Sequence, residues 1–173
     1  MRKVVYYVAT SADGFIARPD GDVAWLDRPQ PSGGYGMVAF YRSVDTVLLG
    51  RKTHEVGRRM GQESYAGKRN VVFSRRSRKG SPGVEFVRED PGAFVRTLRG
   101  AAGKDIWLVG GGALAGALLD AAQVDEIVVH VVPILIGEGI PLFAPRRRSA
   151  SLRLVSSRPF PDGVVRKRYS VSR

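Results

Sequence analysis

Short apolar runs alternate with amphipathic stretches along the chain, and this pattern predicts strands separated by helices. Runs rich in β-branched and aromatic residues predict strands at 4–10, 46–49, 70–73, 83–87, 106–109 and 125–135. Amphipathic or helix-forming stretches predict helices at 37–44, 53–60, 91–98 and 113–119. Thr53 is the expected cap of the second helix, with Glu55 in its first turn. Two last strands, 152–156 and 164–171, flank Pro161-Asp162-Gly163 and predict an antiparallel hairpin.

The order of these elements predicts an α/β fold. Strands that are apolar throughout need cover on both faces, so a mainly parallel sheet with helices on both sides is expected, with the terminal hairpin as an antiparallel edge. The chain has 173 residues, a length that suits one domain. In parallel sheets of this kind, ligands bind beyond the carboxyl ends of the strands.

One strand-to-helix turn carries the most information. The strand that ends at Val109 runs into Gly110, Gly111 and Gly112, and the helix-forming run that begins with Ala113 and Leu114 follows at once. Bare backbone N–H groups and a positive helix end suit a phosphate group. The glycine spacing resembles that of a dinucleotide fingerprint, but most of the chain precedes it, so a Rossmann domain is rejected. A plain tight turn is the alternative.

Two further strands end in polar turns at the same expected rim. Gly50, Arg51, Lys52 and Thr53 place a glycine, two cations and a hydroxyl at a helix start, and Ser74-Arg75 adds a hydroxyl and a guanidinium group. Together the three turns offer separated anion sites. NADPH carries a pyrophosphate and a 2′-phosphate, so these sites suggest NADPH as the cofactor.

Composition and charge narrow the classes of molecule that the chain is expected to bind. The formal net charge of +12 comes from 28 basic and 16 acidic residues, and the basic clusters are 75–76 with 78–79, 146–148 and 166–168. Nucleic-acid binding is not expected, because these clusters are scattered and lack interleaved aromatic residues. The chain has no cysteine and no apolar run of membrane length, and its N-terminus lacks a signal-peptide cleavage site, so we expect a cytoplasmic protein without a membrane partner. The spacing of its only two histidines, His54 and His130, favours no metal site.

Several motifs resemble the dihydrofolate reductase superfamily, and most closely the reductase domain of riboflavin biosynthesis in its small stand-alone bacterial form. The resemblance covers nearly the whole chain and is carried by segments 10–17, 49–53, 109–112, 124–127 and 137–143, together with Pro133. It implies a three-layer α/β/α sandwich on a mostly parallel, eight-stranded mixed sheet, and a homodimer. It also implies NADPH-dependent reduction of a ribosylaminopyrimidine phosphate.

The same resemblance assigns roles to the three turns. Gly50, Arg51, Lys52 and Thr53 would contact the cofactor phosphates, and Ser74 and Arg75 would hold the 2′-phosphate. The remaining cofactor residues would cradle the pyrophosphate and flank the nicotinamide; these are Val109, Gly110, Gly111, Gly112, Ala113 and Leu114.

One departure from the superfamily bears on the substrate. Dihydrofolate reductases carry a pterin-binding carboxylate on the helix before the second strand, whereas segment 35–42 has no acidic residue, which argues against pterin reduction. Asp13 and Glu138 are the carboxylates expected near the substrate, with Asp13 as the candidate proton relay and a turn-forming role as its alternative. Trp25 either closes the substrate side or is a buried loop aromatic. The rival hypotheses are a dihydrofolate reductase and a non-catalytic nucleotide- or nucleic-acid-binding protein.

Overall fold

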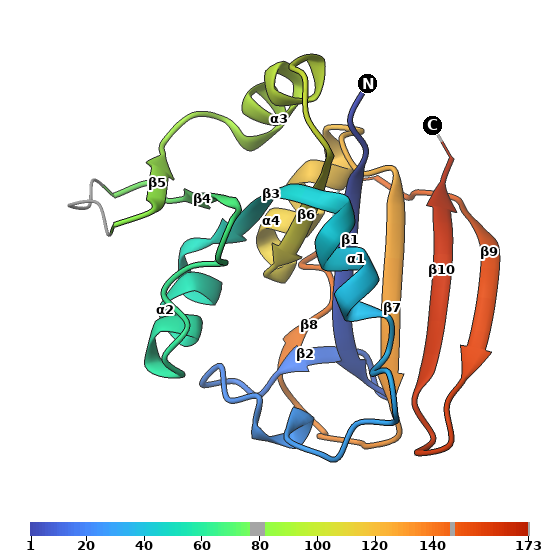
Figure 1. Cartoon of the computed structure of the whole chain (residues 1–173). Helices are drawn as coiled ribbons and strands as arrows, with labels where there is room; N and C mark the ends of the chain where they lie inside the picture. Colours follow the sequence, from blue (N-terminus) through green and yellow to red (C-terminus); the bar gives the residue numbers. More distant parts are fainter. Residues whose placement is uncertain (77–81, 146–147, 173) are drawn as a thin grey trace.

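The chain folds around one large twisted sheet (Figure 1). The computed structural model describes residues 1–76, 82–145 and 148–172, and its eight-stranded sheet has the order β5-β4-β3-β6-β1-β7-β10-β9. In that order the strands span Val84–Val87, Arg69–Phe73, Val44–Gly50, Asp105–Gly110, Val4–Ser11, Glu126–Val132, Val165–Val171 and Leu152–Pro159. Neighbours are parallel from β5 to β7, and β10 is antiparallel to both β7 and β9. The predicted α/β class, the mostly parallel sheet and the antiparallel terminal hairpin are therefore confirmed.

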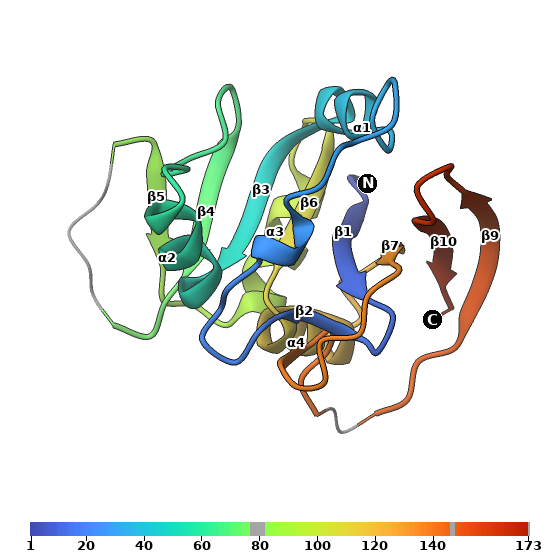
Figure 2. The ribbon, with the colours of Figure 1, turned by 90° about the horizontal axis from the view of Figure 1, so that it is seen from below.

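Helices cover both faces of the sheet, as the apolar strands require. On β1, Val4 and Tyr6 point into one buried cluster, while Val5 and Tyr7 point into the cluster on the opposite face. The first cluster is closed by α3 (Pro91–Gly100) and α4 (Gly112–Asp120), and the second by α1 (Met37–Ser43). Figure 2 shows α1 above the sheet and α4 below it. The helix α2 (Arg51–Arg59) contacts β3 and β4, next to the cluster that α1 closes.

The start of α2 corrects the prediction for Thr53. The helix begins at Arg51 with Gly50 as its cap residue, so Thr53 lies inside the first turn instead of capping it. Gly50 has an extended backbone and is the last residue of β3, so strand and helix join without a loop that could place Thr53 outside the helix. The first turn contains no acidic residue, and Glu55 instead pairs with Arg51 one turn earlier.

The strand β7 is shorter than predicted at both ends. It stops at Val132, because Pro133 has no backbone N–H to continue the ladder. At its start, Asp125 lies outside the strand and its carboxylate accepts a hydrogen bond from the Val4 backbone N–H at 2.8 Å. In the terminal hairpin the predicted turn is present: Gly163 has a φ of +87° and the Phe160 N–H bonds the Val164 carbonyl at 2.8 Å.

A small second sheet was not predicted. The strands β2 (Phe15–Ala17) and β8 (Ile140–Pro141) pair antiparallel below the carboxyl ends of the main strands (Figure 1). The Leu142 N–H also bonds the Gly14 carbonyl at 3.0 Å. A single turn of 3₁₀ helix (Ala24–Leu26) follows in the same loop region. These segments form one wall of the site described next.

Candidate functional site

The carboxyl ends of β3, β4 and β6 lie side by side. The sheet register pairs Gly50 with Phe73 and Leu49 with Gly110, so the turns after these strands are neighbours. A cavity of about 1850 Å³ lies over them. Its lining includes every residue that the sequence suggested for the cofactor: Gly50, Arg51, Lys52, Thr53, Ser74, Arg75, Val109, Gly110, Gly111, Gly112, Ala113 and Leu114.

Two helix N-termini meet in this cavity, and neither is capped by a side chain. The cap residues of α2 and α4 are Gly50 and Gly111, and no side chain bonds either helix start. In α3, by contrast, the Asp90 side chain accepts from the Ala93 N–H at 2.9 Å. A Cβ built on Gly50 would lie 3.5 Å from the Gly111 nitrogen, so the two ends are in contact distance. The positive ends of two helices therefore face the same space, an arrangement that favours an anion.

The three glycines of the β6–α4 turn have different structural roles. Gly110 has a φ of +132°, which favours glycine, and its peptide bond to Gly111 is cis. A Cβ on Gly111 would lie 3.1 Å from the Thr53 hydroxyl oxygen, at the cavity wall. A Cβ on Gly112 would lie 2.4 Å from the Pro141 carbonyl oxygen, so this glycine is needed for packing against the chain after β8.

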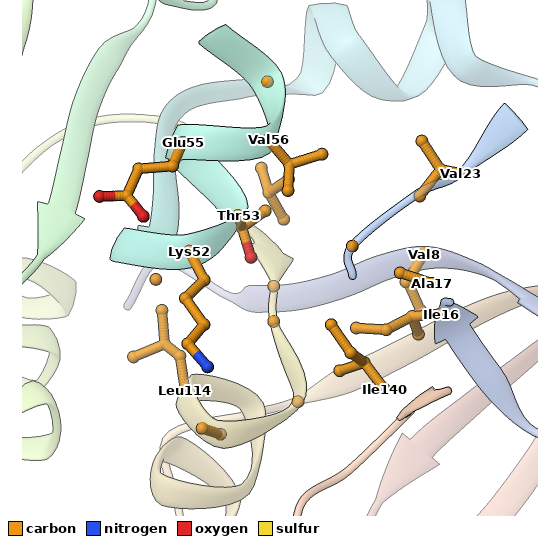
Figure 3. A pocket seen from close by; sticks show the side chains of 18 of the residues that line it. Val8, Ile16, Ala17, Val23, Lys52, Thr53, Glu55, Val56, Leu114 and Ile140 are labelled. Atoms are coloured by element: carbon orange, nitrogen blue, oxygen red, sulfur yellow. The ribbon is translucent and has the colours of Figure 1, made fainter. Parts of the chain in front are cut away.

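The two cations at the start of α2 differ in their partners. The Arg51 guanidinium lies 2.8 and 2.9 Å from the carboxylate oxygens of Glu55. The Lys52 side chain is exposed and reaches toward the first turn of α4 (Figure 3). Within the described part of the chain, Lys52 forms no ion pair, so its charge is available to a bound anion.

Arginines gather at the cavity end beyond β4 and β5. Arg75, Arg76 and Arg88 line this end with exposed side chains, and none of them has an ion-pair partner among the described residues. The Ser74 hydroxyl is buried and is used within its own turn: it donates to the Arg76 carbonyl at 3.0 Å and accepts from the Arg76 N–H at 3.3 Å. In this structure Ser74 shapes the turn and the arginines carry the charge.

The middle of the cavity is apolar. Figure 3 shows Ile16, Ala17 and Ile140, from β2 and β8, opposite Thr53 and Val56 of α2. Pockets for one small molecule are usually about 300–1,000 Å³, and this cavity is about 1850 Å³. It therefore has room for two ligands, one along the turns and one beyond the apolar middle.

The far end of the cavity is aromatic and carries a tyrosine–histidine pair. Tyr7 and His130 lie on β1 and β7, with the Tyr7 hydroxyl 3.3 Å from His130 Nε2, and Trp107 and Tyr35 line the same end. Burial raises the pKa of Tyr7 to about 12, slightly opposed by the charge of Arg166. Burial also lowers the pKa of His130, so the imidazole is neutral near pH 7.

The substrate-side candidates from the sequence lie outside the cavity lining. The exposed Asp13 carboxylate accepts hydrogen bonds from the backbone N–H groups of Ile136 (3.1 Å) and Gly137 (2.8 Å), and a hydrogen bond from Ser11 lowers its pKa. Trp25 packs in a small cluster with Val132, Phe160 and Val164 beneath its loop. Glu138 is exposed. The structure thus brings the cofactor candidates together and leaves these three apart from them.

Some residues that line the cavity were not identified from the sequence. Arg88 follows β5 directly, and its position after a strand end was a usable signal. Tyr7 and His130 were assigned only to strands, because nothing in either segment shows that the strands are neighbours. Their common feature is that both side chains point to the same face of the sheet, which only the strand order reveals.

Among the described residues, the basic clusters lie near different edges of the sheet. Arg75 and Arg76 follow β4, whereas 166–168 lie on β10, near the opposite edge of the sheet. There Arg168 pairs with Glu126 at 2.7 Å and Arg166 donates to the Tyr35 carbonyl at 3.1 Å. The clusters at 78–79 and 146–147 lie outside the described residues.

Across residues 1–76, 82–145 and 148–172, no helix has the length and apolar character needed to cross a membrane. The same ranges contain no cluster of three or more side chains suited to hold a metal ion.

The chain is similar to known proteins in both sequence and structure. Residues 2–166 match the family described as RibD C-terminal domain. The chain is 36% identical to the uncharacterized protein YwjB of Bacillus subtilis, over 94% of this chain and 95% of that protein. A crystal structure of a putative riboflavin biosynthesis protein from Shewanella sp. PV-4 superposes with a TM-score of 0.88 at 27% identity, covering 100% of both chains. Dihydrofolate reductase from Enterococcus faecalis, complexed with NADP(H), has a TM-score of 0.72 at 16% identity, covering 99% of this chain and 97% of that one, and shares the fold.

Proposed function

The chain belongs to the RibD C-terminal domain family and shares its fold with a putative riboflavin biosynthesis protein, and we propose that it is an NADPH-dependent reductase of a small heterocyclic substrate. The observation that carries the proposal is the pair of adjacent, uncapped helix N-termini at one end of a two-ligand cavity. A dinucleotide cofactor supplies anions for both helix ends, and the apolar middle of the cavity suits its nicotinamide ring.

The residues of this chain fit such a cofactor. Glycine at 111 leaves the space beside Thr53 open, so backbone N–H groups can approach a pyrophosphate closely. Lys52 and the start of α2 would hold the same phosphates, and Ile16 and Ile140 would flank the ring. When bound, a reduced nicotinamide supplies the hydride for a reduction.

The arginine-rich end supports NADPH over NADH. Arg75, Arg76 and Arg88 present guanidinium groups that no described carboxylate neutralises, which suits a phosphate monoester. Arg51 contributes less to this preference, because Glu55 already holds its guanidinium.

For the substrate we propose 5-amino-6-(5-phosphoribosylamino)uracil, with dihydrofolate as the alternative. Among the described residues, the carboxylates that line the cavity are Asp20, Glu55 and Glu89. Glu55 lies on α2, Glu89 follows β5, and Asp20 precedes Gly21, whose Cβ position is 2.9 Å from the Val56 side chain of α2. None of the described residues that line the aromatic end is acidic, and α1 has no acidic residue. Asp162 contacts Tyr35 but is not in the lining and already pairs with Tyr35 and Arg28, so the end lacks a free partner for a protonated pterin. A uracil ring offers carbonyl acceptors instead. We also propose a homodimer, supported by the exposed edge strand β9.

Titration of the protein with NADPH and NADH by calorimetry tests the cofactor assignment. The double variant Arg75→Ala/Arg88→Ala should bind NADPH roughly a hundredfold more weakly, about tenfold for each exposed charge-assisted contact, and should bind NADH as before. Arg58→Ala is the matched control, because Arg58 is an exposed arginine of α2 outside this cavity. Equal affinity of the unaltered protein for both cofactors contradicts the arginine assignment.

Absorbance at about 340 nm then follows NADPH oxidation with each substrate. We expect turnover with the aminopyrimidine and little with dihydrofolate. A protein that binds neither cofactor contradicts the proposed function as a whole, and turnover with dihydrofolate alone overturns the substrate.

A further inference from the structure

The Tyr7 hydroxyl differs from those of Tyr6, Tyr35 and Tyr41 in how it is hydrogen-bonded. Tyr6 and Tyr41 donate to backbone carbonyls at 3.0 and 2.7 Å, and Tyr35 donates to Asp162. The Tyr7 hydroxyl has only two long contacts, 3.3 Å to His130 Nε2 and 3.4 Å to the Tyr35 carbonyl. Hydrogen bonds from hydroxyl groups are usually 2.7–2.8 Å long, so the Tyr7 proton is weakly held.

The nearest strong acceptor is already in use. The Tyr35 carbonyl accepts from Arg166 Nη1 at 3.1 Å, a shorter contact than either Tyr7 or His130 makes with it. Arg166 therefore makes the strongest contact with this oxygen, and the Tyr7 hydroxyl has only its two long contacts, to this carbonyl and to His130 Nε2. An acceptor atom brought in by a ligand at a shorter distance would take the Tyr7 hydrogen bond.

Packing fixes the position of the Tyr7 ring, although its hydroxyl makes only long hydrogen-bond contacts. It stacks on Phe40 with 4.2 Å between ring centroids and lies edge-on to Trp107, whose Nε1 donates to the Tyr7 carbonyl at 3.0 Å. The hydroxyl is therefore fixed in position while its proton is free to turn toward the cavity that Tyr7 lines. Fixed position with a transferable proton is what a general acid needs.

We propose that Tyr7 is a catalytic residue, which donates a hydrogen bond and then its proton to the nitrogen of the C=N bond that forms when the ribose of the aminopyrimidine substrate opens. This inference rests on the proposed function. The carbon of that bond gains a hydride, with its two electrons, from the reduced nicotinamide. The π pair moves to the nitrogen, which takes the Tyr7 proton, and water at the cavity mouth returns a proton to the phenolate.

The variant Tyr7→Phe tests this assignment, because it removes the hydroxyl and keeps the stacked ring. Calorimetry with NADPH should give the same affinity as the unaltered protein. Binding of 5-amino-6-(5-phosphoribosylamino)uracil to the protein saturated with NADP⁺, a complex that cannot turn over, should weaken about five- to tenfold. Turnover of that pyrimidine with NADPH should fall by about two orders of magnitude.

Two other tyrosines provide matched controls. Tyr41 packs against the same Trp107 but its hydroxyl bonds Ala66, and Tyr65 lines the cavity from the chain after α2. We expect Tyr41→Phe to bind and turn over as the unaltered protein does, and Tyr7→Phe to lose more turnover than Tyr65→Phe, which removes the other hydroxyl compared here from the cavity lining. Loss of turnover in Tyr65→Phe but not in Tyr7→Phe overturns the assignment.

The binding measurement separates the two proposals. If the unaltered protein binds the pyrimidine but does not oxidise NADPH with it, the proposed function fails, while a weaker complex with Tyr7→Phe still supports the hydrogen bond. Equal pyrimidine affinity in both proteins overturns the role of Tyr7 even if turnover is normal. If neither the pyrimidine nor dihydrofolate binds the unaltered protein, this end of the cavity is not a heterocycle site and the inference fails.

Discussion

Of the three glycines in the strand-to-helix turn, Gly112 is the one at which a side chain would clash most severely. A side chain there would meet the Pro141 carbonyl at 2.4 Å and the Ala144 nitrogen at 3.2 Å, and the Ala144 N–H bonds the Gly112 carbonyl at 3.1 Å. We expect Gly112→Ala to lower the free energy of unfolding by about 2–3 kcal/mol, as overpacking against backbone does. Urea unfolding measures this loss directly.

Gly100→Ala is the control for that variant. Gly100 lies in α3 and a Cβ there would contact nothing within 4 Å, so alanine should raise the free energy of unfolding by about 0.5–1 kcal/mol. Gly111→Ala should fold with a small loss and bind NADPH at least about tenfold more weakly, because the new methyl group occupies the cavity wall. If Gly112→Ala is as stable as the unaltered protein, the segment after β8 moves more easily than its contacts indicate.

The three consecutive glycines illustrate what sequence can and cannot tell about single residues. A strand, three glycines and a helix were enough to predict the turn and its position at the rim of the cavity. The different tasks of Gly111 and Gly112 were not predictable, since the constraint on Gly112 comes from the chain around Pro141. The same holds for Asp13, whose partners Ile136 and Gly137 lie at the far end of the sequence.

Among the elements, β1, β7 and β10 are joined by one carboxylate. Glu126 of β7 accepts from Lys3 Nζ at 2.9 Å and from Arg168 Nε at 2.8 Å. Burial alone would raise the pKa of Glu126, but the hydrogen bonds and charges of Lys3 and Arg168 outweigh it and lower the pKa. For the same reason the pKa of Lys3 is raised.

This arrangement predicts how stability responds to acid. A carboxyl with a lowered pKa in the folded state stabilises the protein above its unfolded pKa of about 4.5, and this contribution is lost as the pH falls through the folded value. Glu126→Gln should therefore be about 1 kcal/mol less stable than the unaltered protein at pH 7, a modest value because both cations are partly exposed. The difference should be smaller at pH 3, where the carboxyl gains protons. Thermal unfolding at the two pH values measures the difference; a gap as large at pH 3 as at pH 7 would assign the effect to shape and not to charge.

At the scale of elements, periodicity predicted the large sheet but not the small one. Buried strands such as β3 and β6 are continuous apolar runs, which the sequence displays openly. The strands β2 and β8 have three and two residues, and β8 contains a proline, so no periodic signal exists for either. The start of α2 was misplaced for a related reason: a threonine is the better known cap, but the direct join between β3 and α2 makes Gly50 the cap residue.

For the whole molecule, the edge of the sheet predicts association. Every residue of β9 is exposed, including Leu152 (44%), Leu154 (54%) and Val155 (47%). An exposed apolar edge strand pairs readily with another chain. We expect light scattering at micromolar concentration to give the mass of a dimer, and Leu154→Lys to shift it toward the monomer.

Val38→Lys is the control for this change, because Val38 is equally exposed (63%) but lies on α1, away from the sheet edge. It should leave the mass unchanged. A monomer in the unaltered protein would contradict the proposed homodimer.

At this scale the site depends on the order of the strands. The contact between Tyr7 and His130 joins residues 123 positions apart, and it exists only because β1 and β7 are parallel neighbours. The sequence pattern of a strand shows which of its side chains point to each face of the sheet. It does not show which strand lies beside it. The turns at the cavity rim could be predicted because each is local, whereas the aromatic end could not.

The strand order also has a consequence for synthesis on the ribosome. The first strand made, β1, lies between β6 and β7 and is tied to their starts by hydrogen bonds that span 102 and 121 residues. Such distant pairing slows folding to the range of about milliseconds to seconds. The apolar β1 therefore has no neighbouring strand until more than half of the chain has been synthesised, and during that interval its apolar side chains are open to aggregation.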